Sequence, residues 1–262
     1  MGEGTSPVTE REQESARCLI AADLASLGVR KGGVLLVHSS LRSLGPLAGG
    51  AETVVRGILK ALGSEGTLLM PALSYENVGP HNGTFDLLHT PSCIGALPEY
   101  FRGRLGTIRS VHPTHSVCGA GPAAARLLAD HQLDATPCGP HSPLHRLPHE
   151  GGQVLFLGCG LRPNTSMHAI EEVVEPPYLF ADDVISYQII LPAGAETTMR
   201  VRAHNFAGWA QRYERLGTLL NGPNLQRGQV LASAAYLVES PAMWEAALGA
   251  LRRDPLFFVE RI

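Results

Sequence analysis

The chain has 262 residues, of which 44% are hydrophobic and 17% are charged. This balance argues against a disordered chain, which has too few apolar residues to bury, and against a coiled coil, which carries far more charge. The formal net charge of -3 argues against binding nucleic acid or an anionic membrane through bulk electrostatic attraction.

Residues 1–16 are polar, and residues 17–262 contain neither an internal repeat nor a linker. We therefore expect a flexible N-terminal tail followed by a single domain. The start of the chain has no apolar segment of a secretory signal, and no run approaches the ~18 apolar residues of a membrane-spanning helix, so the expected location is the cytoplasm. The scattered cysteines, which never form a CxxC pair, argue against a disulfide framework or a cysteine-based zinc site: Cys18, Cys93, Cys118, Cys138 and Cys159.

Apolar runs separated by glycine and proline predict alternating helices and strands. The runs at 34–38 and 153–157 are continuously apolar, which is typical of strands buried on both faces of a helix-covered sheet. A helix between the first of these and the strand at 67–70 makes those two strands parallel neighbours. The remaining expected helices are 13–27, 51–62, 94–102, 123–131, 164–174 and two near the C-terminus, and the remaining expected strands are 107–112, 183–191, 197–202 and 256–260.

The segment 164–174 contains the strongest candidate for catalysis. Asn164 or Thr165 is a suitable N-cap, so a helix should begin directly after the strand at 153–157. Residues three apart share a helix face, which aligns Thr165, His168 and Glu171. A carboxylate beside an imidazole fixes its tautomer and raises its basicity, as in a general base and its orienting partner. The same spacing is also typical of an exposed His–Glu pair on a helix surface.

The polar loop at 38–45 follows the first strand and precedes a helix. Backbone N–H groups and hydroxyls in such a loop could receive a phosphate. The loop matches neither the P-loop pattern nor GxGxxG, and taken alone it is better explained as an ordinary polar connection.

The middle of the chain is rich in histidine. His141, His145 and His149 are spaced by four, but prolines at 140, 143 and 148 interrupt any helix that would align them, and HExxH is absent. We therefore expect no metal. Cys159 lies between two glycines with no known nucleophile signature around it, so we expect a small buried residue. The other histidines of this region are His112, His115 and His131.

In combination, these segments resemble the aminoglycoside 3-N-acetyltransferases, which use acetyl-CoA. The resemblance runs from about Arg17 to Phe258 and depends on the order and spacing of many short pieces. These are 33–43, 66–71, 90–91, Gly95, 98–99, 101–102, 109–110, 112–113, Ser116, 142–143, 152–158, 164–171 and 253–258. The resemblance implies an α/β fold distinct from the Gcn5-related acetyltransferases, with a mixed central sheet flanked by helices and a smaller C-terminal sheet.

The resemblance also implies roles for particular residues. Acetyl-CoA would lie across the loop after the first strand and two further segments, through His38, Ser39, Ser40, Ser43, Leu44, Ser74, Arg109, Ser110, His112 and Ser116. His168 and Glu171 match the His–Glu pair of the family, and Thr165 matches its partner threonine near the thioester. His168 would then take a proton from the aminoglycoside amine as the amine attacks the thioester directly.

The region expected to bind the acceptor departs from the family pattern. Relatives that bind polycationic aminoglycosides tend to cluster acidic residues there, because cationic amines need negative partners. The acceptor residues implied here are Tyr75, Glu76, Asp86 and Asn205. Acidic residues elsewhere in the chain could compensate: Asp86, Glu172, Glu175, Asp182 and Asp183. The departure leaves open a narrower aminoglycoside range or a different amine.

Three other functions remain open at this point. The first is an acetyl-CoA-dependent transferase for a non-aminoglycoside amine, and the second is a cysteine- or metal-dependent hydrolase. The third is an inactive protein that binds CoA or an antibiotic, although the intact Thr165, His168 and Glu171 argue against it. A monomer and a homodimer fit the composition equally well.

Overall fold

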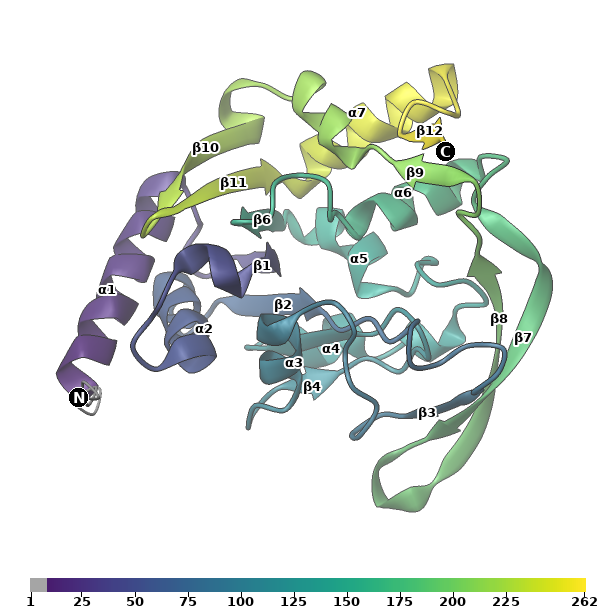
Figure 1. Cartoon of the computed structure of the whole chain (residues 1–262), viewed down its shortest axis with the longest axis horizontal. Helices are drawn as coiled ribbons and strands as arrows, with labels where there is room; N and C mark the ends of the chain where they lie inside the picture. The colour runs from purple at the N-terminus through teal and green to yellow at the C-terminus, as the bar shows by residue number, and fades with distance from the viewer. Residues whose placement is uncertain (1–8) are drawn as a thin grey trace, which may run out of the picture.

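A seven-stranded mixed sheet forms the centre of the computed structural model, which describes residues 9–262 (Figure 1). Its strand order is β10-β11-β6-β1-β2-β5-β4. The three middle strands run parallel, and the other pairs are antiparallel. The bounds are β1 Val34–Ser39, β2 Thr67–Pro71, β4 Ile108–Arg109, β5 Val117–Ala120, β6 Gln153–Leu157, β10 Leu225–Val230 and β11 Ser233–Glu239.

Helices cover both faces of this sheet, as the continuously apolar strands predict. Along β1, Leu35 and Val37 pack into one core with α1 (Glu10–Leu27), α2 (Gly50–Leu62) and α3 (Ala96–Arg102). Val34 and Leu36 point the other way, because side chains alternate along a strand. They pack with α4 (Ala124–Leu128), α5 (Pro143–Arg146), α6 (Ser166–Val174) and α7 (Ser240–Arg253). The expected fold class is therefore confirmed.

A smaller three-stranded sheet lies beside the central one. It joins β3 (Thr84–Asp86), β7 (Phe180–Ile190) and β8 (Glu196–His204) in the order β3-β7-β8. Long strands β7 and β8 lie on the side of the molecule opposite α1 (Figure 1). Strands β9 (Trp209–Gln211) and β12 (Val259–Arg261) form a separate two-stranded ribbon.

The first helix begins earlier than expected. Thr9 caps α1 through its hydroxyl, while the Glu12 side chain accepts a hydrogen bond from the Thr9 backbone, so that the two residues form a capping box. The helix therefore starts at Glu10 and includes much of the expected flexible tail. Residues 1–8 of that tail lie outside the described residues.

The main correction to the expected elements concerns residues 213–239. Instead of two α-helices after β8, the chain forms a six-residue 3₁₀ helix at Tyr213–Thr218, then the hairpin β10–β11, and then α7. The hairpin turn contains no glycine: Leu231 takes the left-handed conformation, with φ 53°. Its N–H donates to the Asp23 carboxylate of α1 at 2.7 Å, so a distant residue stabilises the turn.

Within residues 9–262, no helix combines the length and apolar character needed to cross a membrane.

Candidate active site

A cavity of about 990 Å³ lies where the carboxyl ends of β1 and β6 meet the smaller sheet. His38 and Ser39 line it from the end of β1, and Thr165 and His168 line it from the segment after β6. The wall opposite comes from β7, β8 and the segment 203–213. This position is where ligands generally bind in open α/β sheets, beyond the carboxyl ends of parallel strands.

His168 and Glu171 form a buried pair at the base of the cavity. The Nδ1 atom of His168 lies 3.2 Å from Oε2 of Glu171, as the three-residue helical spacing predicts. Tyr213 donates its hydroxyl to the same carboxylate oxygen at 2.8 Å, and Tyr178 donates to Oε1 at 2.8 Å. Burial next to this carboxylate raises the pKa of both tyrosines, so they remain protonated donors. Glu171 is 0% exposed, so the interpretation as a surface ion pair is wrong.

The start of α6 places Thr165 beside this pair. Asn164 Oδ1 accepts a hydrogen bond from Ser166 N at 3.2 Å and so satisfies one free N–H of the first turn. The Thr165 side chain makes no capping bond, and the residue lines the cavity with 7% exposure. Its hydroxyl therefore remains available to a ligand.

A second histidine–carboxylate pair lies beside the first. Nε2 of His204 is 2.7 Å from Oε1 of Glu172, and Glu172 also accepts from Thr136 Oγ1 at 2.5 Å and Cys138 N at 2.7 Å. Burial raises the pKa of Glu172 to about 7. Burial also lowers the pKa values of His204 and of the neighbouring His115 well below the usual range, so both imidazoles are neutral. His204 and Glu172 lie 32 residues apart in the chain, so no local pattern in the sequence indicated this pair or its place in the site.

His38 and Ser39 present unsatisfied polar atoms at the cavity. The His38 ring stacks on Phe156 of β6 with 5.2 Å between centroids. Burial, with a smaller contribution from His168, lowers the pKa of His38 to about 3. In the described structure, Nε2 of His38 and Oγ of Ser39 are buried without a hydrogen-bond partner. Buried polar groups normally have partners, so these two atoms indicate where a ligand would bond.

The family model for aminoglycoside 3-N-acetyltransferases matches residues 36–252. The chain belongs to this family. It is 34% identical to aminoglycoside N(3)-acetyltransferase IV of Salmonella sp over 251 residues, which is 95% of this chain and 92% of that protein. It is also 34% identical over 177 residues to aminoglycoside N(3)-acetyltransferase IX of Micromonospora chalcea, or 61% of this chain and 62% of that protein. The family members are acyltransferases, so the chain is an enzyme of that class.

Solved structures agree with this placement. A mutant of the aminoglycoside acetyltransferase AAC(3)-IVa in complex with a gentamicin has a TM-score of 0.78 and 33% identity, covering 91% of this chain and 89% of that one. The binary complex of AAC-IIIb with CoASH has a TM-score of 0.78 and 28% identity, covering 90% and 96%.

Several donor-site residues implied by the family resemblance do not line the cavity. The guanidinium of Arg109 donates to Ser116 Oγ at 2.8 Å and to the carbonyls of Thr90 and Ala72. The other side chains are likewise bonded within the protein, and together they shape the loop that presents Thr114 and His115 to the cavity. Ser74 donates its hydroxyl to the Pro113 carbonyl, and Ser116 donates to the Ala72 carbonyl. Ser110 bonds to His131, and Nδ1 of His112 accepts from the N–H groups of Thr114 and His115.

The rest of the implied donor loop lies behind His38 and Ser39. Ser43 donates its hydroxyl to the Ser40 carbonyl at 2.6 Å, and Leu44 belongs to the hydrophobic core. Gly158, at the end of β6, touches this loop: a Cβ there would lie 1.6 Å from Ser43 Oγ, and the φ of 71° already favours glycine.

Two of the four implied acceptor residues, Tyr75 and Asn205, line the cavity. Glu76 and Asp86 do not, and the Asp86 carboxylate accepts from Leu88 N and His89 N at 2.9 Å each. Among the lining residues of the described chain, Asp183 has the one carboxylate side chain, whereas Ile185, Phe206 and other apolar side chains form much of the wall.

The remaining histidines and Cys159 lie outside the cavity. His141 bonds to Asp134, whereas His145 contacts the rings of His149 and Trp244, so the three equally spaced histidines do not converge. Burial raises the pKa of the Cys159 thiol to about 11, which disfavours the thiolate that a nucleophile requires.

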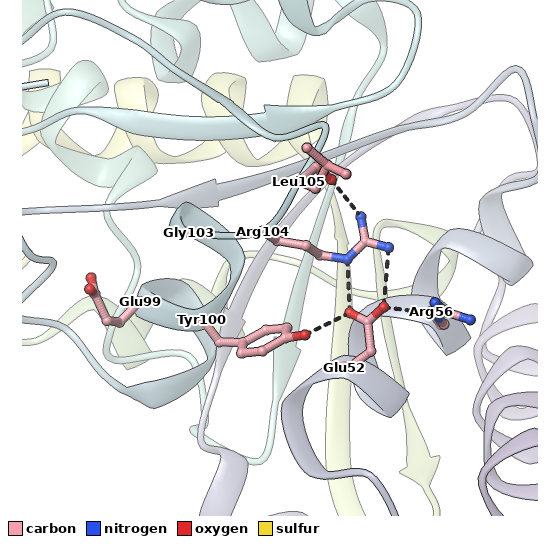
Figure 2. Close-up of a pocket in the computed structure, with 7 residues that line it drawn as sticks. All are labelled: Glu52, Arg56, Glu99, Tyr100, Gly103, Arg104 and Leu105. Carbon is pink, nitrogen blue, oxygen red and sulfur yellow. Dashed lines mark hydrogen bonds and ion pairs between the residues drawn. The ribbon is translucent and has the colours of Figure 1, made fainter. Parts of the chain in front are cut away.

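A second hollow, of about 620 Å³, lies between α2 and α3 (Figure 2). Glu52 there accepts hydrogen bonds from Arg56 at 2.6 Å, Arg104 at 2.8 Å and Tyr100 at 3.0 Å. Desolvation opposes ionisation, but these three donors together lower the pKa of Glu52 to about 2. Glu52 faces both guanidinium groups, whereas Glu99 points away from them (Figure 2) and pairs with Arg102, so these side chains form a structural ion-pair network.

Proposed function

We propose that the enzyme transfers the acetyl group of acetyl-CoA to the 3-amino group of an aminoglycoside by direct attack, and thereby confers antibiotic resistance. The observation that carries this proposal is the state of His168. Its Nδ1 is engaged by Glu171 and by the Tyr213 hydroxyl at 3.1 Å, which leaves Nε2 for the cavity. The relatives are named as N(3)-acetyltransferases, which supports the choice of reaction.

His168 acts as the general base, and Glu171 orients it. The aminoglycoside amine attacks in its neutral form, after the ammonium has lost one proton to solvent, and Nε2 accepts the second proton, which the nitrogen loses as it bonds to the thioester carbonyl carbon. When the carbon–sulfur bond breaks, the electron pair leaves with the sulfur, and the proton on His168 can pass to the CoA thiolate. Holding donor and acceptor in line supplies much of the rate. The Thr165 hydroxyl stabilises the negative charge that develops on the carbonyl oxygen.

Acetyl-CoA binds at the end of β1. The unsatisfied Nε2 of His38 and Oγ of Ser39 support this placement, because a ligand would supply the partners that these buried atoms lack. A related structure with CoASH bound supports the identity of the donor. Burial keeps the His38 imidazole neutral. Its Nε2 therefore offers acetyl-CoA a hydrogen bond and no positive charge that would attract the CoA phosphates.

The acceptor wall favours a restricted range of amines. Asp183 has the one carboxylate side chain among the described lining residues, and the nearby Glu171 and Glu172 are already bonded to His168 and His204, so a polycationic antibiotic finds few free carboxylate side chains. A second candidate, an acetyl-CoA-dependent transferase for a less cationic amine, rests on this same apolar wall. It shares the donor site and the base with the first proposal.

Free-thiol release from acetyl-CoA tests the proposal with a panel of aminoglycosides and of monocationic amines. We expect turnover on at least one aminoglycoside, with the product acetylated at the 3-amino group by NMR. The matched control Cys159→Ser should retain full turnover, because no thiol takes part. Turnover confined to monocationic amines would select the second candidate, and loss of turnover in Cys159→Ser would contradict direct attack.

A further inference from the structure

Three buried histidines converge in the cavity although they lie far apart in the sequence. His115 comes from the loop before β5, His168 from α6 and His204 from the end of β8. One ring nitrogen of each lies within 4.8 Å of those of the other two. Their ring centroids are 5.7 Å (115–168), 5.2 Å (115–204) and 5.0 Å (168–204) apart.

Each of these histidines uses one nitrogen to bond to the protein and leaves the other available. Nδ1 of His168 contacts the Glu171 carboxylate, and Nδ1 of His115 lies 2.9 Å from the Thr114 hydroxyl. His204 bonds through Nε2 to the Glu172 carboxylate, and its Nδ1 is buried with no partner among the described residues. The His204 side chain is only 5% exposed, so this orphaned nitrogen faces the interior.

This arrangement has the chemistry of a three-histidine zinc site. Tetrahedral zinc with Zn–N bonds of about 2.0–2.1 Å holds its imidazole nitrogens about 3.4 Å apart and the ring centres about 5 Å apart. The observed centroids already match, so small side-chain rotations would bring the nitrogens to that spacing. Metal-bound histidines characteristically use the second nitrogen to bond a carboxylate or other acceptor, as His168 and His204 do here.

We propose that His115, His168 and His204 bind one Zn²⁺ ion through Nε2, Nε2 and Nδ1, with a solvent molecule as the fourth ligand. The neutral imidazoles that burial enforces at His115 and His204 suit this role, since a ligand nitrogen must carry a free lone pair.

The site has a consequence for turnover that rests on the proposed function. A zinc ion would occupy the lone pair of His168 Nε2, which is the atom that accepts the proton from the amine. The zinc-bound enzyme is therefore inactive in acetyl transfer, and zinc acts as a reversible inhibitor at the base itself.

Metal binding is measured first, on the untagged protein and independently of activity. Calorimetry with Zn²⁺ should give one ion per chain, and Co²⁺ should bind with the visible spectrum of a tetrahedral nitrogen site. Two variants remove one ligand each and keep its hydrogen bond. Asparagine at 115 reproduces Nδ1 toward Thr114, and glutamine at 204 reproduces Nε2 toward Glu172.

His115→Asn and His204→Gln should each weaken Zn²⁺ binding at least tenfold. Replacing even a hydrogen-bond partner of a metal ligand lowers metal affinity about 10–100-fold, and these variants remove a ligand itself. His149→Gln, an exposed histidine outside the cavity, should bind as the wild type does. Absence of Zn²⁺ binding by the wild type, a non-tetrahedral Co²⁺ spectrum, or equal affinity in all four proteins would overturn the site.

Inhibition is measured separately, by mass spectrometry of the acetylated product, because Zn²⁺ also binds free thiols. Turnover of the wild type should fall in proportion to the zinc-occupied fraction and return when a chelator removes the ion. Turnover that persists in the fully loaded enzyme would overturn inhibition. If no aminoglycoside is a substrate but Zn²⁺ binds through these three histidines, the proposed function fails and the zinc site stands.

Discussion

Glu171 is held by two buried tyrosines, but only one of them also contacts the base. Tyr213 reaches both Glu171 Oε2 at 2.8 Å and His168 Nδ1 at 3.1 Å, whereas Tyr178 reaches Glu171 Oε1 alone. Tyr213 comes from a segment 45 residues away from His168 in the chain, so no local pattern could indicate it. The proximity of Thr165, His168 and Glu171 could be predicted, because residues spaced by three lie on the same face of a helix.

The two tyrosines provide a matched pair of variants. Tyr213→Phe should lower kcat about tenfold and leave the KM for acetyl-CoA nearly unchanged, because a hydrogen bond to a charged group contributes about 1.5–3 kcal/mol. Tyr178→Phe should lower kcat less, since it leaves His168 untouched. Steady-state kinetics and the pH profile of kcat check this. Equal losses in both variants, or a loss confined to KM, would show that Tyr213 does not position His168.

The packing of the loop after β1 against the end of β6 depends on one glycine. Gly158 combines a φ of 71° with close contact to Ser43 Oγ and Ser233 Oγ, so the loop after β1 lies against the end of β6. This contact, like the turn at Leu231, joins segments far apart in the chain. The local sequence therefore predicted β1, β2 and β6 from their apolar runs but missed the hairpin β10–β11.

Alanine substitutions at Gly158 and Gly160 distinguish the cost of a steric clash from the cost of backbone strain. Gly160 has a similar φ of 65° but no atom within 4 Å of an added Cβ. Gly160→Ala should therefore destabilise by about 1–2 kcal/mol, from the left-handed conformation alone. Gly158→Ala should destabilise more and raise the KM for acetyl-CoA severalfold, because the donor loop must move. Urea unfolding and kinetics measure both, and equal effects of the two variants would contradict the contact.

At the scale of the whole molecule, burial lowers the pKa values of five histidines. Desolvation lowers the pKa of His38 to about 3 and of His131 to about 4, and it lowers those of His112, His115 and His204 well below 6.5. The sequence showed only a histidine-rich region. Burial of these residues depends on contacts between distant segments, such as the His38 ring on Phe156 of β6 and the His115 ring beside His204 of β8, and composition carries no record of such contacts.

These histidines make the fold sensitive to acid. Between pH 6.5 and about 4 the unfolded chain takes up protons that the folded chain does not bind, so stability falls as the pH falls. At pH 5 each such histidine lowers the free energy of unfolding by about 2 kcal/mol. Glu172, with its pKa raised to about 7, works in the opposite direction but is a single group. Urea midpoints from pH 7.5 to 5 should fall steadily, and a flat or rising profile would contradict the prediction.

The central proposal is that His168 removes the proton from the attacking amine. Asparagine at 168 reproduces Nδ1 toward Glu171 and deletes Nε2, so it removes the base and retains the buried contact. Thiol release should be measured for wild type and His168→Asn with the same aminoglycoside, alongside acetyl-CoA affinity by calorimetry. We expect kcat to fall about 10²–10⁴-fold with the affinity for acetyl-CoA unchanged. An unchanged kcat would remove His168 from the role of general base.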